Sequence, residues 1–381
     1  MKIAIQAADL DASRIDGTRV YILNLLRRFG GLAPRDDFYI YHKSEFNPEL
    51  APPDFPNYKI KKIKSPFLWT QTRFAWELLK DKPDILWMPM HNIPLMRSKK
   101  IKTVVTVHDL AYKYFPDYFP GKDLILLNML GDMAIKNAGK LIAISESTKR
   151  DILKFYPSVN ADKIRVIYHG FDAELFQKNI PDKEKNEILS KFKIQNSKFI
   201  LYSGAIQPRK NLGRLIEAFE IFKKSPLSSS LPKGERDDLK LVLAGERAWL
   251  WKSILAKAEN SPFKNDIIIT GKLKFGDLSA LTRSAGVYAY PSLYEGFGIP
   301  VLEAFASKVP VILSNNSSLP EVGGGAAQYF RADSNEELAE KIKTVLLDES
   351  LRKQMIAKGL EQIGKFSWEK CARETLDWIK S

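Results

Sequence analysis

Short apolar runs alternate with helix-like stretches along most of this chain, in two series separated by a polar, lysine-rich stretch. Runs that are short and apolar throughout predict buried strands of parallel sheets with helices packed on both faces. The fold class predicted is therefore α/β, with one sheet for each series. In open α/β sheets ligands bind at the carboxyl ends of the strands, so the loops that follow strands are the candidate functional segments.

The strands expected in the first series are Lys2–Gln6, Phe38–His42, Ile85–Met88, Thr103–Val107, Leu141–Ile144 and Ile164–Ile167, with helices at Arg19–Phe29 and Ser147–Tyr156. Those of the second series are Lys198–Ser203, Leu239–Ala244, Asp266–Thr270, Val287–Tyr290 and Val309–Leu313, with helices from about Asn335 onward. The polar residues Gln177–Asn196 mark the expected domain junction. The Ser-, Pro- and charge-rich residues Ser225–Asp238 predict a mobile surface loop.

The length of 381 residues favours two domains over one. A single cysteine, Cys371, excludes an internal disulfide and suits a reducing compartment. The N-terminal residues read as a strand rather than a signal peptide, and no apolar run approaches the ~18 residues of a membrane span. We therefore expect a cytoplasmic protein without a transmembrane helix.

The net charge of +14 is concentrated in part at two basic clusters, Lys59–Lys64 and Arg97–Lys102. A solvated face is one explanation, and attraction to an anionic membrane surface is the other. Nucleic-acid binding is disfavoured because no nucleic-acid module accompanies the charge. The aromatic and basic segment Pro66–Trp76 predicts either an amphipathic core helix or an element facing a membrane or an acceptor.

The segment Tyr290–Ala306 combines a strand end, a Gly-Phe-Gly turn and a helix start. Pro291 ends the strand, and Pro300 suits the first helical position, where its missing N–H would be unpaired anyway. Glu295 then lies in the loop and Glu303 in the first helical turn. Such a helix start presents backbone N–H groups and a positive dipole end to an anion. Two carboxylates beside it indicate a ligand with phosphate and hydroxyl groups, such as a nucleotide sugar.

The loop Gly204–Leu212 follows the first strand of the second series. Asn211 is a predicted N-cap, so Arg209 and Lys210 stand at a helix N-terminus. A guanidinium can bind two phosphate oxygens at once, while an ammonium acts as a compact charge. A solvated basic loop is the alternative. As polar loop residues, both are expected to be replaceable with little loss of stability.

In the first series, His108 and Asp109 follow a buried strand directly, although a lone histidine is often structural. Gly17 and Thr18 begin a helix after the first strand, and Gly17 permits close approach of a ligand. No Gly-x-Gly-x-x-Gly fingerprint supports dinucleotide binding. Asp9-Leu-Asp11 matches the Asp-x-Asp pattern of some metal sites, but such triplets are common by chance. No His/Cys cluster has metal-ligand spacing.

Five motifs, in order along the chain, resemble those of retaining glycosyltransferase family 4 (glycosyl transferases group 1). They are Val107–Asp109, Ile144–Ser147, Tyr168–Asp172, Ser203–Asn211 and the Glu-x7-Glu pair of Glu295 and Glu303. The resemblance covers essentially the whole chain. It implies the GT-B fold, two Rossmann-like α/β/α domains facing each other across a cleft. These would be residues 1–180 and 181–364, with residues 365–381 forming a C-terminal helix that crosses back to the first domain.

By this resemblance the catalytic residues are His108, Arg209, Lys210 and Glu295. Arg209 and Lys210 would hold the donor diphosphate, Glu303 the ribose, and Glu295 and His108 the transferred sugar. The remaining donor-binding residues would be Gly17, Thr18, Gly204, Gly271, Lys272, Leu273, Gly296, Phe297, Gly298 and Ile299. The loop Gly271–Leu273 matches the one whose backbone meets the nucleobase. The sequence departs from the family at Asp16–Thr18, where many members have a Gly-Gly or Gly-Ile-Gly step.

The His-Asp-Leu loop and Met90–Pro94 most resemble mannosyltransferase-type members. The predicted reaction is retaining hexosyl transfer, first from GDP-mannose and second from a UDP-sugar, to a glycan or polyprenyl-linked acceptor in cell-envelope polysaccharide synthesis. No cofactor or metal is expected. The basic clusters either contact an anionic membrane surface or form a solvated face. The alternatives are a GT-B nucleotide-sugar epimerase and a catalytically degenerate nucleotide-sugar-binding scaffold. The sequence leaves the acceptor, the linkage and the oligomeric state open.

Overall fold

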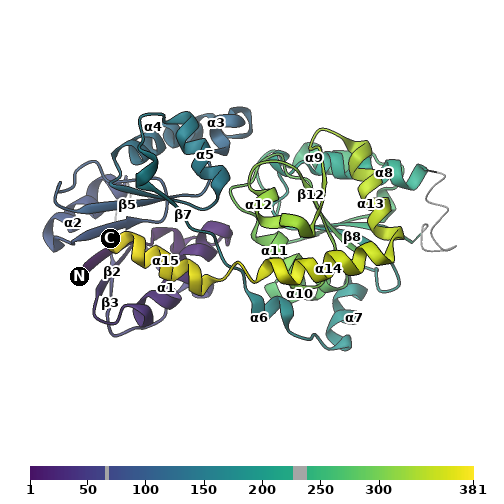
Figure 1. Ribbon diagram of the computed structural model, residues 1–381, viewed down its shortest axis with the longest axis horizontal. Coiled ribbons are helices and arrows are strands. Elements are labelled where there is room, and N and C mark those ends of the chain that lie inside the picture. Colours follow the sequence, from purple (N-terminus) through teal and green to yellow (C-terminus); the bar gives the residue numbers. More distant parts are fainter. Residues whose placement is uncertain (65–67, 226–237) are drawn as a thin grey trace. The chain divides into compact units, whose positions relative to one another are not determined.

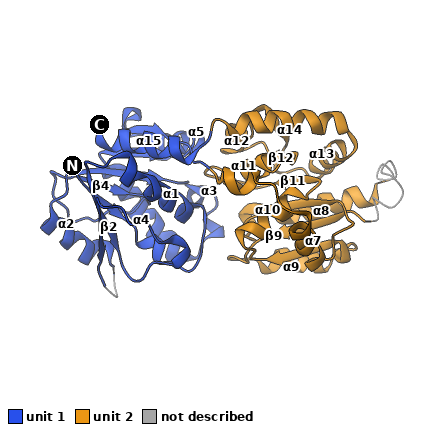
Figure 2. Ribbon diagram, turned by 90° about the horizontal axis from the view of Figure 1, so that it is seen from below, with its two compact units in different colours: residues 1–170, 366–381 blue, residues 171–365 orange. Residues whose placement is uncertain are grey.

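The computed structural model describes residues 1–64, 68–225 and 238–381. It divides into two compact units, unit 1 (residues 1–170 and 366–381) and unit 2 (residues 171–365), coloured blue and orange in Figure 2. The boundaries lie at 170/171 and 365/366, where the sequence suggested 180/181 and 364/365. The lysine-rich stretch Gln177–Asn196 is not the junction, because it contains helix α7 (Asp182–Lys191) of unit 2.

Unit 1 is built on a parallel sheet whose strands run in the order β3-β2-β1-β4-β5-β6-β7 in the described residues. The strands are β1 (Lys2–Gln6), β2 (Asp37–His42), β3 (Tyr58–Lys62), β4 (Ile85–Met88), β5 (Lys102–Val107), β6 (Lys140–Ala143) and β7 (Ile164–Val166). Its central strands are buried on both faces, as continuous apolar runs predict.

The helices of unit 1 are α1 (Gly17–Leu32), α2 (Ala75–Asp81), α3 (Ala111–Tyr114), α4 (Gly121–Asn137), α5 (Glu146–Phe155) and α15 (Trp368–Lys380), with short turns η1 (Ala8–Asp11), η2 (Pro48–Leu50), η3 (Thr70–Phe74), η4 (Pro116–Tyr118) and η5 (Ala161–Lys163). The C-terminal helix α15 packs along α1, yellow beside purple in Figure 1. Lys380 at its end is 2.6 Å from the carboxylate of Asp36. The last residues of the chain therefore complete the unit formed by the first.

Unit 2 repeats this plan with the order β10-β9-β8-β11-β12-β13. Its strands are β8 (Phe199–Ser203), β9 (Lys240–Ala244), β10 (Ile267–Gly271), β11 (Val287–Tyr290), β12 (Val311–Ser314) and β13 (Gln328–Phe330). Its helices and turns are α6 (Ala173–Gln177), α7 (Asp182–Lys191), η6 (Pro208–Lys210), α8 (Leu212–Lys224), α9 (Lys252–Glu259), η8 (Lys264–Asp266), α10 (Phe275–Arg283), α11 (Ile299–Ala306), α12 (Leu319–Gly323), η9 (Gly324–Ala326), α13 (Asn335–Leu347) and α14 (Glu349–Ile363).

The α/β class and every predicted strand are confirmed, with strand ends within two residues of those expected. Two strands were missed. β3 is an edge strand whose lysines face solvent, so it read as a basic cluster, and β13 has only three residues. The loop predicted at Ser225–Asp238 falls, apart from its two end residues, outside the described part of the chain.

Candidate active site

The carboxyl edge of the unit 2 sheet is lined by glycines with positive φ. Gly204, Gly245 and Gly271 stand at the ends of β8, β9 and β10, and Gly298 lies in the loop after β11. Their φ angles lie between +72° and +152°, a region that side-chain-bearing residues rarely adopt. The backbone along this edge is therefore free of side chains where a ligand would approach the loops.

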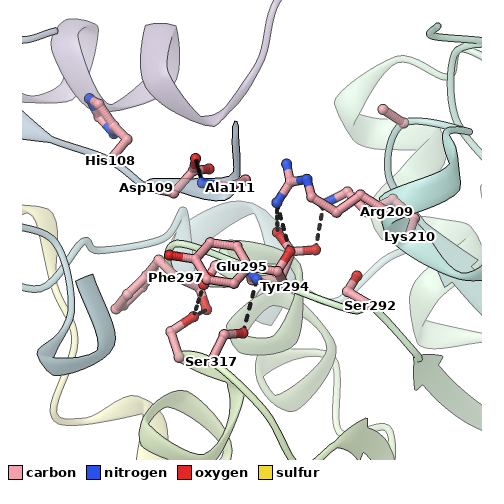
Figure 3. A network of polar contacts seen from close by, with 12 residues as sticks. His108, Asp109, Ala111, Arg209, Lys210, Ser292, Tyr294, Glu295, Phe297 and Ser317 are labelled. Carbon is pink, nitrogen blue, oxygen red and sulfur yellow. Dashed lines mark hydrogen bonds and ion pairs between the residues drawn. The ribbon is translucent and has the colours of Figure 1, made fainter. Parts of the chain in front are cut away.

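A buried ion cluster lies at the same edge. Lys210, in the turn η6, has its ammonium 2.5 Å from one carboxylate oxygen of Glu295 and 3.2 Å from the hydroxyl of Tyr290. Arg209 places its guanidinium 3.6 Å from the other oxygen and donates a 2.6 Å hydrogen bond to the Tyr294 carbonyl. Figure 3 shows both cations pointing at this one carboxylate. The residues predicted to hold a diphosphate thus meet a residue predicted to contact sugar.

Burial acts to raise the pKa of Glu295, but Lys210 and Arg209 outweigh it, so the pKa is lowered and the carboxylate is ionised. The two cations and one anion leave a net positive charge in a buried place. A second anion such as a phosphate is attracted to it. Lys210 is itself buried and paired, so the expectation that it could be removed with little loss of stability does not hold.

Glu303, eight residues further along the chain, has the opposite environment. It lies half-buried in α11, and within the described residues its carboxyl has no hydrogen-bond or ion-pair partner. Burial, with a smaller contribution from Asp172, raises its pKa to about 8. It is therefore largely protonated at neutral pH and can both donate and accept a hydrogen bond, as a group that binds hydroxyls requires.

The Gly-Phe-Gly loop is fixed by two serines. Ser317 accepts a 2.9 Å hydrogen bond from the Glu295 N–H (Figure 3). The Ser318 hydroxyl lies 2.9 and 2.7 Å from the carbonyl oxygens of Glu295 and Phe297. In the part of the chain that the structure describes, the N–H groups of Gly298 and Ile299 donate to no acceptor. Unpaired donors at a helix start can bind an anion, which is the role that the sequence predicts for this segment.

Asn211 does not cap α8 as predicted. Its φ of 58° is left-handed and its side chain accepts no capping hydrogen bond. Instead its amide donates to the carbonyl oxygens of Pro291 and Ala332, at 3.1 and 2.9 Å. Asn211 therefore ties the turn that carries Arg209 and Lys210 to the loop after β11.

The other predicted donor-binding residues of unit 2 lie along the same edge. Gly204 directly follows β8, and Gly271 and Lys272 line a hollow of about 450 Å³ at the ends of β9 and β10, with Leu273 next in the chain. Gly17 and Thr18 belong to unit 1 and begin α1 after the cap Asp16, whose side chain accepts from the Arg19 N–H. Sequence reasoning overlooked Glu246 and Arg247 in the hollow, since they follow β9 without a recognisable motif.

The corresponding edge of unit 1 has histidines in place of an ion cluster. His108, directly after β5, is buried and its Nε2 lies 2.8 Å from the Pro89 carbonyl, so Nε2 carries the proton. Its ring packs edge-on against Tyr21. Burial lowers the pKa of His108, against the smaller opposing effect of the Pro89 hydrogen bond. The residue after it, Asp109, accepts a hydrogen bond from the Ala111 N–H (Figure 3).

His91 was not singled out by sequence reasoning. It lies parallel to the ring of Tyr112, with centroids 6.0 Å apart, and among the described residues its ring nitrogens have no hydrogen-bond partner. Burial lowers its pKa to about 4, although Asp109 acts in the other direction. Gly131 in α4 leaves the space for both rings, because an added Cβ would lie 2.8 Å from the Tyr112 hydroxyl.

Asp11 of the Asp9-Leu-Asp11 triplet has a structural role. Its carboxylate accepts hydrogen bonds from the N–H groups of Lys43 and Ser44 and lies 3.1 Å from His42. Across residues 1–64, 68–225 and 238–381, no group of three or more His, Cys, Asp or Glu side chains could hold a metal ion. In the same residues no helix is long and apolar enough to cross a membrane.

Two family models match the chain in succession. Residues 15–175 match "Glycosyltransferase Family 4", and residues 184–362 match "Glycosyl transferases group 1". The chain belongs to glycosyltransferase family 4. The resemblance drawn from the five motifs is thereby confirmed, and the enzyme is a hexosyltransferase.

This glycosyltransferase is 29% identical over 312 residues to O-antigen chain mannosyltransferase B of Escherichia coli, covering 81% of the chain and 77% of that protein. It is 28% identical over 297 residues to the serotype-specific mannosyltransferase WbdA of Escherichia coli, which is 76% of this chain but only 34% of WbdA. The structure of Anabaena HepE in complex with UDP and glucose superposes with a TM-score of 0.75 at 16% identity, covering both chains fully. This likeness supports the GT-B fold.

Proposed function

We propose that the enzyme transfers a mannosyl group from GDP-mannose, with retention at the anomeric carbon, to a glycan or polyprenyl-linked acceptor in cell-envelope polysaccharide synthesis. The observation that carries the proposal is the cluster of Arg209, Lys210 and Glu295 beside the unpaired N–H groups of Gly298 and Ile299. Relatives named as O-antigen mannosyltransferases support the sugar and the pathway, and the UDP and glucose in HepE support a nucleotide-sugar donor.

In this proposal unit 2 binds the donor. The diphosphate takes the place beside Arg209 and Lys210, whose charges stabilise the negative charge that grows as the sugar–phosphate bond breaks. The protonated Glu303 hydrogen-bonds the ribose hydroxyls, and Glu295, with the N–H groups of the Gly-Phe-Gly loop, binds the sugar. The two fixed cations supply the charge that a divalent ion supplies elsewhere, so we propose metal-independent transfer.

The reaction exchanges one bond at the anomeric carbon for another. The bond to the diphosphate oxygen breaks, and the acceptor hydroxyl oxygen attacks from the same face, so configuration is retained. The acceptor proton passes to the departing diphosphate oxygen. No enzymic base is then required, which accords with a His108 that is buried and uncharged. We assign His108 to contact with the sugar, and Gly17 and Thr18 to the diphosphate.

A thermal-shift screen with GDP-mannose, UDP-glucose and ADP-glucose, each in the presence of a chelator, tests the donor. A ligand that binds only the folded state raises its stability, so GDP-mannose should give the largest shift. Arg209→Ala should abolish the shift. Arg214→Ala is the matched control, because Arg214 lies in α8 and bonds the Asp333 carbonyl. No shift with any donor, or an equal shift in Arg209→Ala, would overturn the proposal.

We also propose that the enzyme is cytoplasmic and that unit 1 contacts an anionic membrane. Unit 1 has 30 Lys and Arg against 21 Asp and Glu, so it holds most of the excess positive charge. Outward-facing Arg73, Trp76 and Lys80 follow one another along η3 and α2, with Trp76 54% exposed. Leu95, 58% exposed, is held nearby by its N–H bond to the Gln71 side chain. Apolar and basic side chains combined on one face suit an anionic lipid surface.

Sedimentation with phosphatidylglycerol vesicles tests this surface. The wild type should sediment at low salt, and Trp76→Ser with Leu95→Ser should reduce the bound fraction severalfold. Leu250→Ser, an exposed apolar residue of unit 2, should have no effect. Equal binding to uncharged phosphatidylcholine vesicles, or no loss in the double variant, would contradict the proposal.

A further inference from the structure

The hollow at the ends of β9 and β10 includes Gly271 and Lys272 of the loop that the family resemblance assigns to the nucleobase, together with two residues, Glu246 and Arg247, that no motif singled out. Its volume of about 450 Å³ falls within the range of small-molecule sites. Its lining residues are Glu246, Arg247, Ile269, Thr270, Gly271 and Lys272. β9 lies beside β8, whose following loop leads to Arg209 and Lys210. The hollow and the ion cluster therefore share one sheet edge.

Backbone contacts join the hollow to the ion cluster. The Ile206 N–H donates to the Glu246 carbonyl at 2.8 Å, and the Ala248 N–H donates to the Ile206 carbonyl at 3.0 Å. The loops are pressed so closely together that a Cβ on Gly245 would lie 1.8 Å from the Gly204 carbonyl oxygen. Ile206 is followed closely by η6, so the hollow is held in a fixed relation to the proposed diphosphate site. A nucleoside diphosphate whose phosphates bind at Arg209 and Lys210 would have its base along this same sheet edge.

The polar side chains of the hollow that can contact a base are Glu246 and Lys272, which are paired with each other. They lie 3.3 Å apart and both are partly exposed. The Thr270 hydroxyl is occupied by the Gly271 carbonyl, at 2.9 Å, and Arg247 lies over the Trp251 ring, 4.7 Å from its centroid. The hollow thus offers the two acceptor oxygens of one carboxylate, Glu246, next to the donor ammonium of Lys272.

This arrangement matches one base. Guanine presents an acceptor, O6, followed by two adjacent donors, N1–H and N2–H. Uracil presents an acceptor on both sides of its single donor, so a carboxylate that bonds its N3–H also faces a carbonyl oxygen. Adenine has no pair of adjacent donors. A buried or half-buried polar group left unpaired by the wrong base is costly, which makes such an arrangement selective.

With the nucleobase at this loop, as the family resemblance implies, we infer that Glu246, with Lys272, selects guanine. The carboxylate of Glu246 accepts from N1–H and N2–H, and Lys272 exchanges its contact with Glu246 for one to O6. The inference rests on the proposed function, because it takes the ligand to be a nucleotide sugar. It makes Glu246 the residue that determines which nucleotide the enzyme uses.

Calorimetric titration with GDP, IDP and UDP tests the inference without an acceptor. IDP lacks only the N2 amino group. The wild type should bind GDP roughly 10-fold or more tightly than IDP or UDP. Glu246→Gln, which replaces one carboxylate oxygen by a donor, should bring GDP to within about twofold of IDP and leave UDP unchanged. Glu340→Gln, at an exposed pair with Lys343, is the control and should leave all three affinities as they are.

The outcomes separate this inference from the proposed function. Arg209→Ala should weaken the binding of all three nucleotides by a similar factor, because Arg209 is proposed to contact the diphosphate that they share. Equal binding of GDP and UDP by the wild type, or an unchanged preference in Glu246→Gln, would refute guanine selection and leave the nucleotide site in place. If none of GDP, IDP and UDP binds, the proposed function itself is refuted.

Discussion

The two sheets end in edges of contrasting chemistry. In unit 2 the edge has four glycines of positive φ and a buried cluster of two cations and one carboxylate. In unit 1 the described residues include no glycine of positive φ, and the edge holds two uncharged histidines packed on aromatic rings, His108 buried and His91 partly buried. The same topology therefore carries paired cations in one unit and uncharged histidines in the other. We attribute the difference to the proposed division between donor and acceptor binding.

The largest expected effect comes from replacing the buried lysine of the unit 2 edge. Lys210→Met should lower the free energy of unfolding by roughly 2–4 kcal/mol, because Glu295 keeps only the more distant Arg209. It should also abolish donor binding. Lys223→Met is the matched control, since Lys223 is equally buried and Asp266 keeps Lys240 when it is removed.

Urea denaturation and calorimetric titration of both variants separate the two effects. Lys223→Met should lose less stability, because Asp266 keeps Lys240 at 2.5 Å, and should still bind the donor. Donor binding that survives in Lys210→Met, or disappears in both variants, would contradict the role of the ion cluster.

Acid should act on unit 1 through His91. Its folded-state pKa of about 4 lies below the ordinary value of 6.5, so the stability it contributes is present above pH 6.5 and is lost as pH falls toward 4. The loss should reach roughly 2–3 kcal/mol. His91→Gln should flatten this dependence. Hydrogen exchange at β4 and β5, compared with β8 and β11, measures it, and faster acid opening of unit 2 than of unit 1 would contradict the contrast.

Glu303 should act in the opposite direction. Its pKa is raised to about 8, so the stability it contributes is full below its ordinary value of 4.5 and is lost as pH rises through about 8. Glu303→Gln should remove a loss of roughly 2–3 kcal/mol between pH 5 and 8. Glu295, whose pKa is lowered, should instead cost stability only as pH falls below about 4.5. Identical pH profiles for Glu303→Gln and the wild type would show that the carboxyl is solvated.

The smallest expected effect concerns the glycine loop. Gly298→Ala should destabilise unit 2 by roughly 1 kcal/mol and weaken donor binding. The φ of Gly298 is +122°, and an added Cβ would lie 3.2 Å from Leu319. Gly276→Ala, at a helical position with nothing within 4 Å of the Cβ, should be neutral or stabilising. Thermal unfolding measures both variants. Equal melting temperatures would show that the positive φ of Gly298 does not require glycine.

Much of the fold could be predicted because a strand buried on both faces is a continuous apolar run. β3 escaped detection since its lysines face solvent at an edge, and α7 did so since only Ile188 and Leu189 are buried in a lysine-rich helix. The residues of the ion cluster were found, but not their pairing. Lys210 and Glu295 are far apart in the sequence, and no local pattern encodes such a contact. Glu246 belongs to no recognisable sequence motif, and its role can be inferred only from its contact with Lys272 in the structure.

Hydrogen exchange with and without GDP-mannose compares the two sheet edges in one experiment and shows which of them binds the donor. We expect the strongest protection in unit 2, at residues 204–212, 245–248, 271–273 and 295–303. Protection confined to unit 1 around residues 89–91 and 108–111, with the unit 2 edge unchanged, would contradict this expectation.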